Sequence, residues 1–153
     1  MIILDATTKT LEILLGGAVI TNQLPFTASY IDVTTTTYVP VEQDGTTNNT
    51  TAVTLASAPG ASTQRQVKLI DVQNADTVSA TVTIRYNNNA TTRTLFKAAL
   101  ATGAHLIYAD GEGWRTFDSS GQLLQAGAAG STNALLDASN HTDTVAQTVS
   151  RGS

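Results

Sequence analysis

The chain has 153 residues, of which 13% are charged, with a formal net charge of −4 and no cysteine. A typical soluble domain has about 25% charged residues, so the surface of this chain is expected to be unusually neutral. The length suits about one domain with a sizeable core. Scattered basic residues and a negative net charge argue against nucleic-acid binding, and the lack of cysteine excludes disulfides, a thiolate nucleophile and Cys-ligated zinc.

The first segment, residues 1–17, is apolar and ends at the pair Gly16 and Gly17, where a strand or short arm must turn. It lacks a basic n-region, and charged residues interrupt its apolar runs. We therefore expect neither a signal peptide nor a membrane span here. Residues 1–17 are interpreted as an N-terminal strand or arm.

The middle zone, residues 18–124, is predicted to hold the strands. Residues 23–41 are expected to form one long strand region, with edge or bend signals at Pro25 and Pro40 because proline cannot donate to a β-ladder. Residues 41–51 are then expected to be a loop centred on Asp44 and Gly45. Further strands of ordinary length, separated by turn sequences, are predicted at residues 51–57, 65–73, 79–86, 91–98, 105–110 and 113–118.

Two of these strands have an informative pattern. In residues 80–86, Val82 and Ile84 alternate with Thr81 and Thr83, which predicts a half-buried antiparallel strand with a neutral threonine face. Asn87 to Asn89 are expected to supply a left-handed turn to the next strand. In residues 65–73 the apolar positions change parity, so this strand is either central and covered on both faces or carries a β-bulge, and we favour a central strand.

The regular strand spacing predicts an all-β fold, an antiparallel β-sandwich, with the jelly roll as one variant of it. Residues 125–153 are rich in Ala, Gly, Ser, Thr and Asn and have few apolar anchors. This segment cannot bury enough apolar surface to fold alone, so it is predicted to be an extended low-complexity arm or linker that a neighbour orders.

The candidate chemical groups favour no reaction. His105 and His141 lack a second histidine or a carboxylate at helical ligand spacing, so His105 is interpreted as a surface or packing residue. Asp110 and Glu112 lie in the sequence DGEG, which offers too few oxygens for calcium. We interpret DGEG as a hairpin turn in which Asp110 and Gly111 take positive φ.

Other catalytic patterns are also missing from the sequence. Asp71 and Asp76 are interpreted as solvated loop acids and not as a glycosidase pair. No GxSxG elbow accompanies the serines, and Gly16–Gly17 does not form a GxxxxGK phosphate loop. We predict no enzymatic activity, no cofactor and no metal site.

Several stretches resemble a family of small structural proteins of tailed bacteriophages and prophages. They are LDATTKTLEILLGGAVITNQLPFTASYIDV, APGASTQRQVKLIDVQNADT, VTIRYNNNATTRTLF and ADGEGWRTFDSSGQLL, which lie within residues 4–124. The resemblance implies a virion component assembled in the host cytoplasm, either a head decoration (cement) protein or the attachment domain of a head or tail fibre. The segment LLDASNHTDTVAQTVSRGS is similar to a connector in phage fibres.

The resemblance also implies the partners, which are the major capsid protein or another virion protein, and further copies of the chain in a homotrimer. It supplies no active-site residue. We expect contacts to the shell or to neighbouring subunits from apolar residues of the N-terminal segment and the C-terminal arm, namely Ile2, Ile3, Leu4, Leu135, Leu136, Val145 and Val149.

Two alternatives stay open on the sequence. One is a receptor-binding or carbohydrate-binding module in which Trp114, Tyr108 or Tyr86 stacks on sugars. The other is a depolymerase, which would require Asp71, Asp110 and Glu112 to line one deep pocket.

Overall fold

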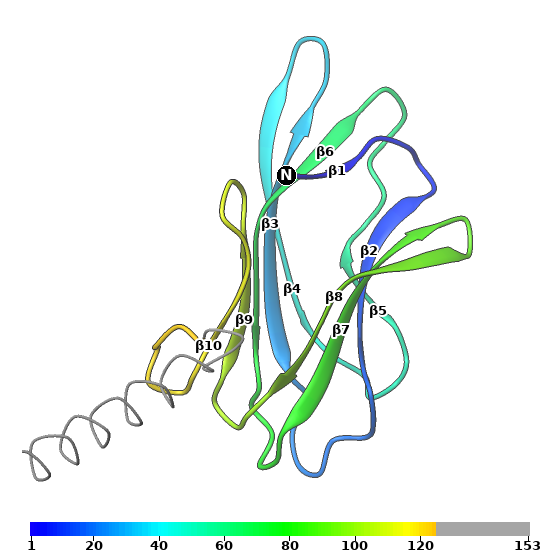
Figure 1. Cartoon of the computed structure of the whole chain (residues 1–153). Coiled ribbons are helices and arrows are strands. Elements are labelled where there is room, and N and C mark those ends of the chain that lie inside the picture. Colours follow the sequence, from blue (N-terminus) through cyan, green and yellow to red (C-terminus); the bar gives the residue numbers. More distant parts are fainter. Residues whose placement is uncertain (125–153) are drawn as a thin grey trace, which may run out of the picture.

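Two antiparallel β-sheets pack face to face in the computed structural model, which describes residues 1–124 (Figure 1). The six-stranded sheet contains β1 (Ile2–Leu4), β3 (Pro25–Val33), β4 (Tyr38–Thr46), β6 (Gln64–Gln73), β9 (His105–Ala109) and β10 (Gly113–Phe117). The four-stranded sheet contains β2 (Lys9–Leu15), β5 (Val53–Ala56), β7 (Ala80–Asn88) and β8 (Thr91–Leu100). The predicted all-β antiparallel sandwich is therefore confirmed.

The strands follow the order β10-β9-β6-β3-β4 in the larger sheet and β5-β2-β7-β8 in the smaller one. β1 pairs with β6 from Arg65 to Val67, and β9 pairs with the same strand from Leu69 to Gln73, so they share one edge of β6. The pairing of β2 with β7 and of β3 with β6 is nested, as in jelly rolls, whereas the hairpins β3–β4 and β7–β8 stay within single sheets.

The core lies between the sheets and follows the period-2 pattern of the strands. On β7, Val82 and Ile84 are fully buried, while Thr81 and Thr83 point outward, as their alternation predicts. The side chains that are fully buried and largest come from both sheets and from the connections: Leu4, Leu11, Ile13, Leu24, Leu55, Val67, Ile70, Val72, Val82, Ile84, Leu100 and Leu106. Each contributes about 1.5–3 kcal/mol of burial free energy before entropy is counted.

The strand β6 is central and also bulged. It pairs with β3 on one side and with β9 and β1 on the other. Its register against β3 shifts at Lys68, because Val67 lies opposite Tyr30 and Leu69 lies opposite Ser29. The extra residue explains the parity change in the sequence.

The threonine run at residues 34–37 is a hairpin turn and not part of a long strand, so the strand prediction for residues 23–41 was wrong there. The hydroxyl of Thr34 accepts hydrogen bonds from the backbone N–H groups of Thr36 and Thr37, at 3.2 and 3.0 Å. Such local bonds offer the backbone an alternative to a β-ladder. The chain therefore reverses between Val33 and Tyr38.

The loop predicted for residues 41–51 was also wrong over much of its length, because β4 continues through Asp44 and Gly45 to Thr46. Gly45 is needed for packing: a Cβ there would lie 2.7 Å from Cζ of Phe26 on β3. The glycine allows the buried ring to pack directly against the backbone of the neighbouring strand.

Two turns contain residues with left-handed backbone, as expected, but some of these residues differ from the expected ones. Asn89 and Ala90, with φ of 51° and 68°, join β7 to β8, whereas Asn87 and Asn88 belong to β7 itself. In the β9–β10 turn the positive φ angles belong to Gly111 and Gly113. The expectation that Asp110 takes positive φ was wrong, and its side chain instead forms an ion pair with Lys68.

Residues 1–17 form β1 and β2, which belong to different sheets of the same sandwich (Figure 1). The proposed arm at residues 125–153 lies outside the described residues.

Candidate interaction surface

One outer face of the sandwich carries apolar side chains. On the six-stranded sheet the residues that alternate with the core positions point away from it, and in several strands they are apolar. We call this set the apolar face, with one residue from each of β1, β3, β4, β6 and β9: Ile3, Ile31, Pro40, Leu69 and Ile107. Leu69 is 39% exposed, although the core residues on either side of it along β6 are largely buried.

The apolar face is hollowed over β3, β4 and the bulge of β6. The hollow has a volume of about 440 Å³ and is lined by Ser29, Tyr30, Ile31, Pro40, Val41, Glu42 and Lys68. Because four of the seven lining residues are apolar or aromatic, the hollow suits an apolar side chain with a polar group at the rim.

The rim of the hollow carries the exposed acid Glu42 and the basic residue Lys68, of which Lys68 is paired with a carboxylate. Lys68 Nζ donates to Asp110 Oδ2 at 2.7 Å, and the N-terminal amine of Met1 lies 3.6 Å from Asp110 Oδ1. The hydrogen bond from Lys68 lowers the pKa of Asp110, and the same bond raises the pKa of Lys68. Both groups stay ionised near neutral pH, and their fields partly cancel.

The opposite outer face, on the four-stranded sheet, is a threonine surface. Thr81 and Thr83 on β7 and Thr92 and Thr94 on β8 point outward there. Arg85 and Glu12 on this face form an ion pair, in which Arg85 Nε donates to Glu12 Oε2 at 2.7 Å. This face therefore offers hydroxyl groups with little net charge.

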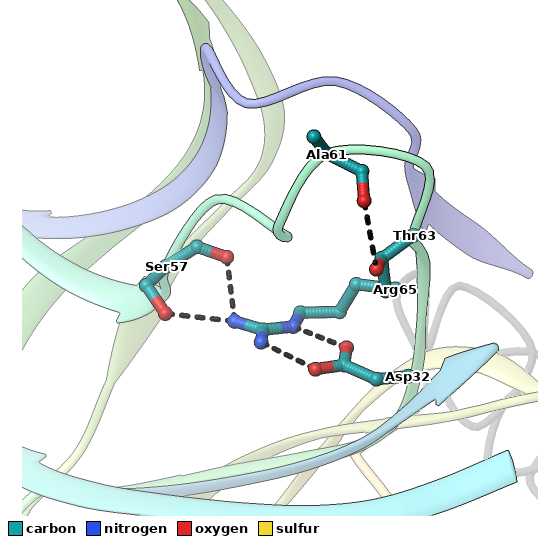
Figure 2. Close-up of polar contacts among 5 residues, drawn as sticks. All are labelled: Asp32, Ser57, Ala61, Thr63 and Arg65. Atoms are coloured by element: carbon teal, nitrogen blue, oxygen red, sulfur yellow. Dashed lines mark hydrogen bonds and ion pairs between the residues drawn. The ribbon is translucent and has the colours of Figure 1, made fainter. Parts of the chain in front are cut away.

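A buried arginine closes one end of the sandwich (Figure 2). Arg65 on β6 is 7% exposed, and it donates from Nε and Nη2 to the two oxygens of Asp32 on β3, each at 2.7 Å. Its Nη1 donates to the backbone oxygen and the hydroxyl of Ser57, at 2.8 and 2.7 Å. The guanidinium also lies 4.0 Å from the ring centroid of Tyr30. With every contact directed at the protein itself, this network is structural.

Asp76 is a buried acid, so its interpretation as a solvated loop acid was wrong. It is 1% exposed, and its two oxygens accept backbone N–H bonds from Ile20, Thr21 and Asn22 at 2.8, 2.8 and 3.2 Å. These bonds, led by the one from Ile20, lower the pKa of Asp76 to about 2. The carboxylate fixes the β2–β3 connection and is fully used in doing so.

His105 lies at the surface, where Asp71 accompanies it. Nδ1 of His105 on β9 is 2.9 Å from Oδ1 of Asp71 on β6, beside a small hollow of about 130 Å³. The interpretation of Asp71 as a loop acid was wrong, because it lies within β6. Asp71 and Asp76 form no carboxylate pair, since Asp76 binds the backbone of residues 20–22. Thr27 lines the same hollow, but within residues 1–124 no hydrogen bond joins its hydroxyl to His105, as a nucleophile in a catalytic triad would require.

The acids that a depolymerase would need do not converge. Asp71 is paired with His105, Asp110 with Lys68, and Glu112 with Arg115 at 3.0 Å. Within residues 1–124, no group of three or more His, Asp or Glu side chains is arranged to hold a metal ion.

The aromatic residues proposed for sugar stacking pack against the protein itself. Trp114 on β10 is half-buried, with its ring centroid 5.2 Å from that of Phe96 on β8 and 5.0 Å from that of Tyr108 on β9. Tyr108 is 3% exposed, and burial raises the pKa of its hydroxyl. Tyr86 is half-buried and packs on the core. The cluster closes the sandwich between β8 and β10.

The Gly16–Gly17 pair lies at a polar hollow of about 320 Å³. The N–H of Gly16 donates to the backbone oxygen of Thr81 at 2.8 Å, and a Cβ at Gly16 would lie 3.2 Å from that threonine. The first glycine is thus used to bring the end of β2 close to β7.

The contact residues expected in the N-terminal segment have different positions in the structure. Ile3 points outward on the apolar face, Ile2 packs against the core, and Leu4 is fully buried in it. Leu4 therefore contacts this chain's own core. The expected contact residues Leu135, Leu136, Val145 and Val149 lie outside the described residues.

The sequence reasoning missed the apolar face as a whole. Its local signals include Ile31, Leu69 and Ile107, which are apolar residues at outward positions of their strands. Which side of a strand faces outward depends on pairing between segments distant in sequence, so the face emerges only in the folded sheet.

Within residues 1–124 the structure has no helix that is long and apolar enough to cross a membrane. No protein-family model, curated protein or solved structure matches the chain.

Proposed function

We propose that this protein is a non-enzymatic structural component of a bacteriophage virion, a decoration (cement) protein that binds the major capsid protein and stabilises the head. The observation that carries the proposal is the apolar face with its hollow of about 440 Å³, on a molecule whose opposite outer face is rich in threonine. An exposed apolar patch rimmed by polar groups is typical of a protein–protein contact.

The arrangement of charge supports the same role. One acid on each outer face is held by a basic partner, Glu12 by Arg85 and Asp110 by Lys68, whereas Glu42 and Asp44 on β4 are exposed to solvent. A surface with compensated charge can pack against another subunit without a large desolvation cost. The stretches that resemble phage structural proteins contribute β2 and β3, as well as β6, β10 and most of the β7–β8 hairpin.

Binding to the shell stabilises the decoration protein by mass action, because the shell recognises only its folded state. The same linkage stabilises the shell. A trimer is the assembly that we propose, since local threefold positions of a capsid present three equivalent sites.

The test is cosedimentation of the purified protein with capsid shells of the phage that encodes it. Leu69→Asp places a charge on the apolar face, and Thr94→Asp places the same charge on an exposed position of the threonine surface. We expect Leu69→Asp to reduce the bound fraction at least about tenfold, the effect of losing one buried contact of about 1.4 kcal/mol. Thr94→Asp is expected to bind as the unchanged chain does.

Circular dichroism controls for the fold of both variants. Equal loss of binding in both variants would remove the apolar face from the proposal. Imaging of whole particles locates the protein: density on the tail would replace head decoration with fibre attachment, and binding to glycans instead of shells would favour a receptor-binding module.

A further inference from the structure

Two exposed apolar side chains lie on neighbouring connections at the lower end of the sandwich in Figure 1. Ile20, between β2 and β3, is 72% exposed, and Val78, between β6 and β7, is 43% exposed. The two connections are in contact, because Oγ1 of Thr21 lies 3.3 Å from Oγ1 of Thr77. We call Ile20 and Val78 the apolar tip. Burial of such side chains is favourable, so the tip is suited to contact with a partner.

The backbone of the apolar tip is held in place by buried side chains. Asp76 accepts the backbone N–H groups of residues 20–22 at 2.8, 2.8 and 3.2 Å. Nδ2 of Asn74 donates to the backbone oxygen of Val78 at 2.9 Å. A segment that is already ordered loses little conformational freedom when a partner covers it. The tip therefore has the properties of a preorganised anchor.

The hollow on the apolar face is complementary to this tip. Its volume is about 440 Å³, and Ile31, Pro40 and Val41 supply apolar parts of its wall. It has room for the side chain of Ile20. The tip does not fill the hollow of its own chain, because the tip is fixed before the start of β3. The hollow begins about four residues, or about 13 Å, further along that strand.

The exposed charges beside the tip and the hollow have opposite signs. Lys97 on β8 is exposed and lines the polar hollow of about 320 Å³ that borders the apolar tip. Glu42 on β4 is exposed and lines the hollow on the apolar face. Among the side chains of residues 1–124, neither of them has a partner in an ion pair. A contact between tip and hollow brings these two charges together.

The other charges at these two places already have partners. Asp76 lines the polar hollow, but it is 1% exposed and its oxygens accept the backbone N–H groups of residues 20–22. Lys68 lines the hollow on the apolar face, but its Nζ donates to Asp110 at 2.7 Å. An ion pair at the rim of a contact contributes more to orientation than to affinity. Lys97 and Glu42 can therefore set the orientation of the tip in the hollow.

We infer that the apolar tip of one copy inserts into the hollow between β3 and β4 of a second copy, with Ile20 in the hollow and Lys97 beside Glu42 at its rim. Tip and hollow are different surfaces, so the contact is head to tail. The tip lies at one end of the sandwich and the hollow on one face, so each contact turns the next copy. Such contacts close into a ring when their rotations add up to a full turn.

This inference rests on the proposed function, because it supplies the contact between copies in the proposed trimer. It also divides the apolar face between two partners. The hollow over β3 and β4 receives the neighbouring copy, while Ile3, Leu69 and Ile107 on β1, β6 and β9 remain for the shell.

Mixing two variants of the full chain tests the contact without any particle. Ile20→Asp removes the anchor of the tip, and Ile31→Asp places a charge in the wall of the hollow. Each variant keeps the half of the contact that the other has lost, and the two altered surfaces repel each other. In sedimentation velocity we expect each variant alone to be a monomer where the unchanged chain is oligomeric. The equimolar mixture is expected to form a one-to-one dimer.

The expected effect is a dissociation constant at least about tenfold higher for each variant alone. Pro40→Asp, at an exposed position of the same wall, serves as a second hollow variant. The matched control is Leu95→Asp, because Leu95 is 41% exposed and lines neither hollow. It is expected to assemble as the unchanged chain does, and circular dichroism checks the fold of every variant.

A charge exchange tests the orientation of the tip. Lys97→Glu and Glu42→Lys are each expected to weaken association by about two- to fivefold, as for an exposed ion pair. The two substitutions in one chain are expected to restore the dissociation constant of the unchanged chain. Double variants that are weaker than both single variants would overturn the placement of Lys97 beside Glu42.

Three results would overturn the contact itself. They are an unchanged chain that stays monomeric up to about 1 mM, a folded pair of variants that forms no mixed dimer, and equal weakening by Leu95→Asp. A failed shell-binding test with a positive mixing test would instead remove the proposed function and leave the contact between copies standing. The two failures are therefore distinguishable.

Discussion

Arg65 on β6 forms a bidentate ion pair with Asp32 on β3, in which Nε donates to Oδ1 and Nη2 donates to Oδ2, both at 2.7 Å. The side chain of Arg65 is 9% exposed and that of Asp32 is 23% exposed, so the pair is shielded from water on most sides. The Asp32 hydrogen bond raises the pKa of Arg65, which holds the guanidinium charged throughout the accessible pH range.

Replacing this arginine is expected to be costly. Arg65→Met keeps much of the volume but leaves the Asp32 carboxylate and the Ser57 oxygens without their donor. The free energy of unfolding is expected to fall by about 3 kcal/mol, as for other buried pairs that lose one partner. Urea denaturation measures the loss. The control Arg93→Met, at an exposed position on β8, is expected to change stability by less than about 0.5 kcal/mol.

Asp76 is expected to make stability depend on acid. Its pKa is lowered from 3.8 to about 2 in the folded state, so the folded protein favours the ionised form. The stabilisation is then fully present above about pH 4 and is lost as the pH falls toward about 2. Thermal unfolding of Asp76→Asn and of the unchanged chain, from neutral pH down to about pH 2, measures this effect. At neutral pH the variant should melt well below the unchanged chain. Near pH 2 the difference between the two melting temperatures should be smaller. An equal difference at both ends would contradict the assignment.

The sequence predicted the strands whose local pattern agrees with their final environment. Val82 and Ile84 alternate with threonines on a strand that has one core face, so the period-2 pattern is sufficient. The parity change in β6 was also visible, but it left a bulge and a central strand covered on both faces as alternatives. The register of β6 against β3 shows that an extra residue shifts the parity.

Other features depend on contacts that local patterns do not contain. The carboxylate of Asp76 finds its donors at residues 20–22, more than 50 positions away, and Asp71 meets His105 across neighbouring strands. The threonine run at residues 34–37 has strong β propensity, but its hydroxyls bond locally and turn the chain. These outcomes are set by tertiary packing and side-chain bonding.

Trp114 is expected to act as a packing residue. Its ring stacks on Phe96 and contacts Tyr108, so Trp114→Ala leaves a gap where β10 closes against β8. Because the side chain is half-buried, we expect a loss of about 3 kcal/mol, at the low end for a large aromatic residue. Guanidinium denaturation followed by circular dichroism measures it. A variant that keeps full stability and loses binding to a glycan would instead support the sugar-stacking alternative.

Gly45 is expected to be intolerant of even one methyl group. A Cβ at this position would lie 2.7 Å from Cζ of Phe26 and 3.2 Å from its Cε1, so Gly45→Ala must push the buried ring away from the backbone of β4. Such overpacking costs about 1–3 kcal/mol, and urea denaturation should show a lower midpoint with an unchanged slope. Gly17→Ala is the matched control, because no atom lies within 4 Å of its Cβ position and φ is not positive there. If the two substitutions lower the free energy of unfolding equally, the close approach of Phe26 does not explain the glycine at position 45. The continuation of β4 through residues 44 and 45 then needs another cause.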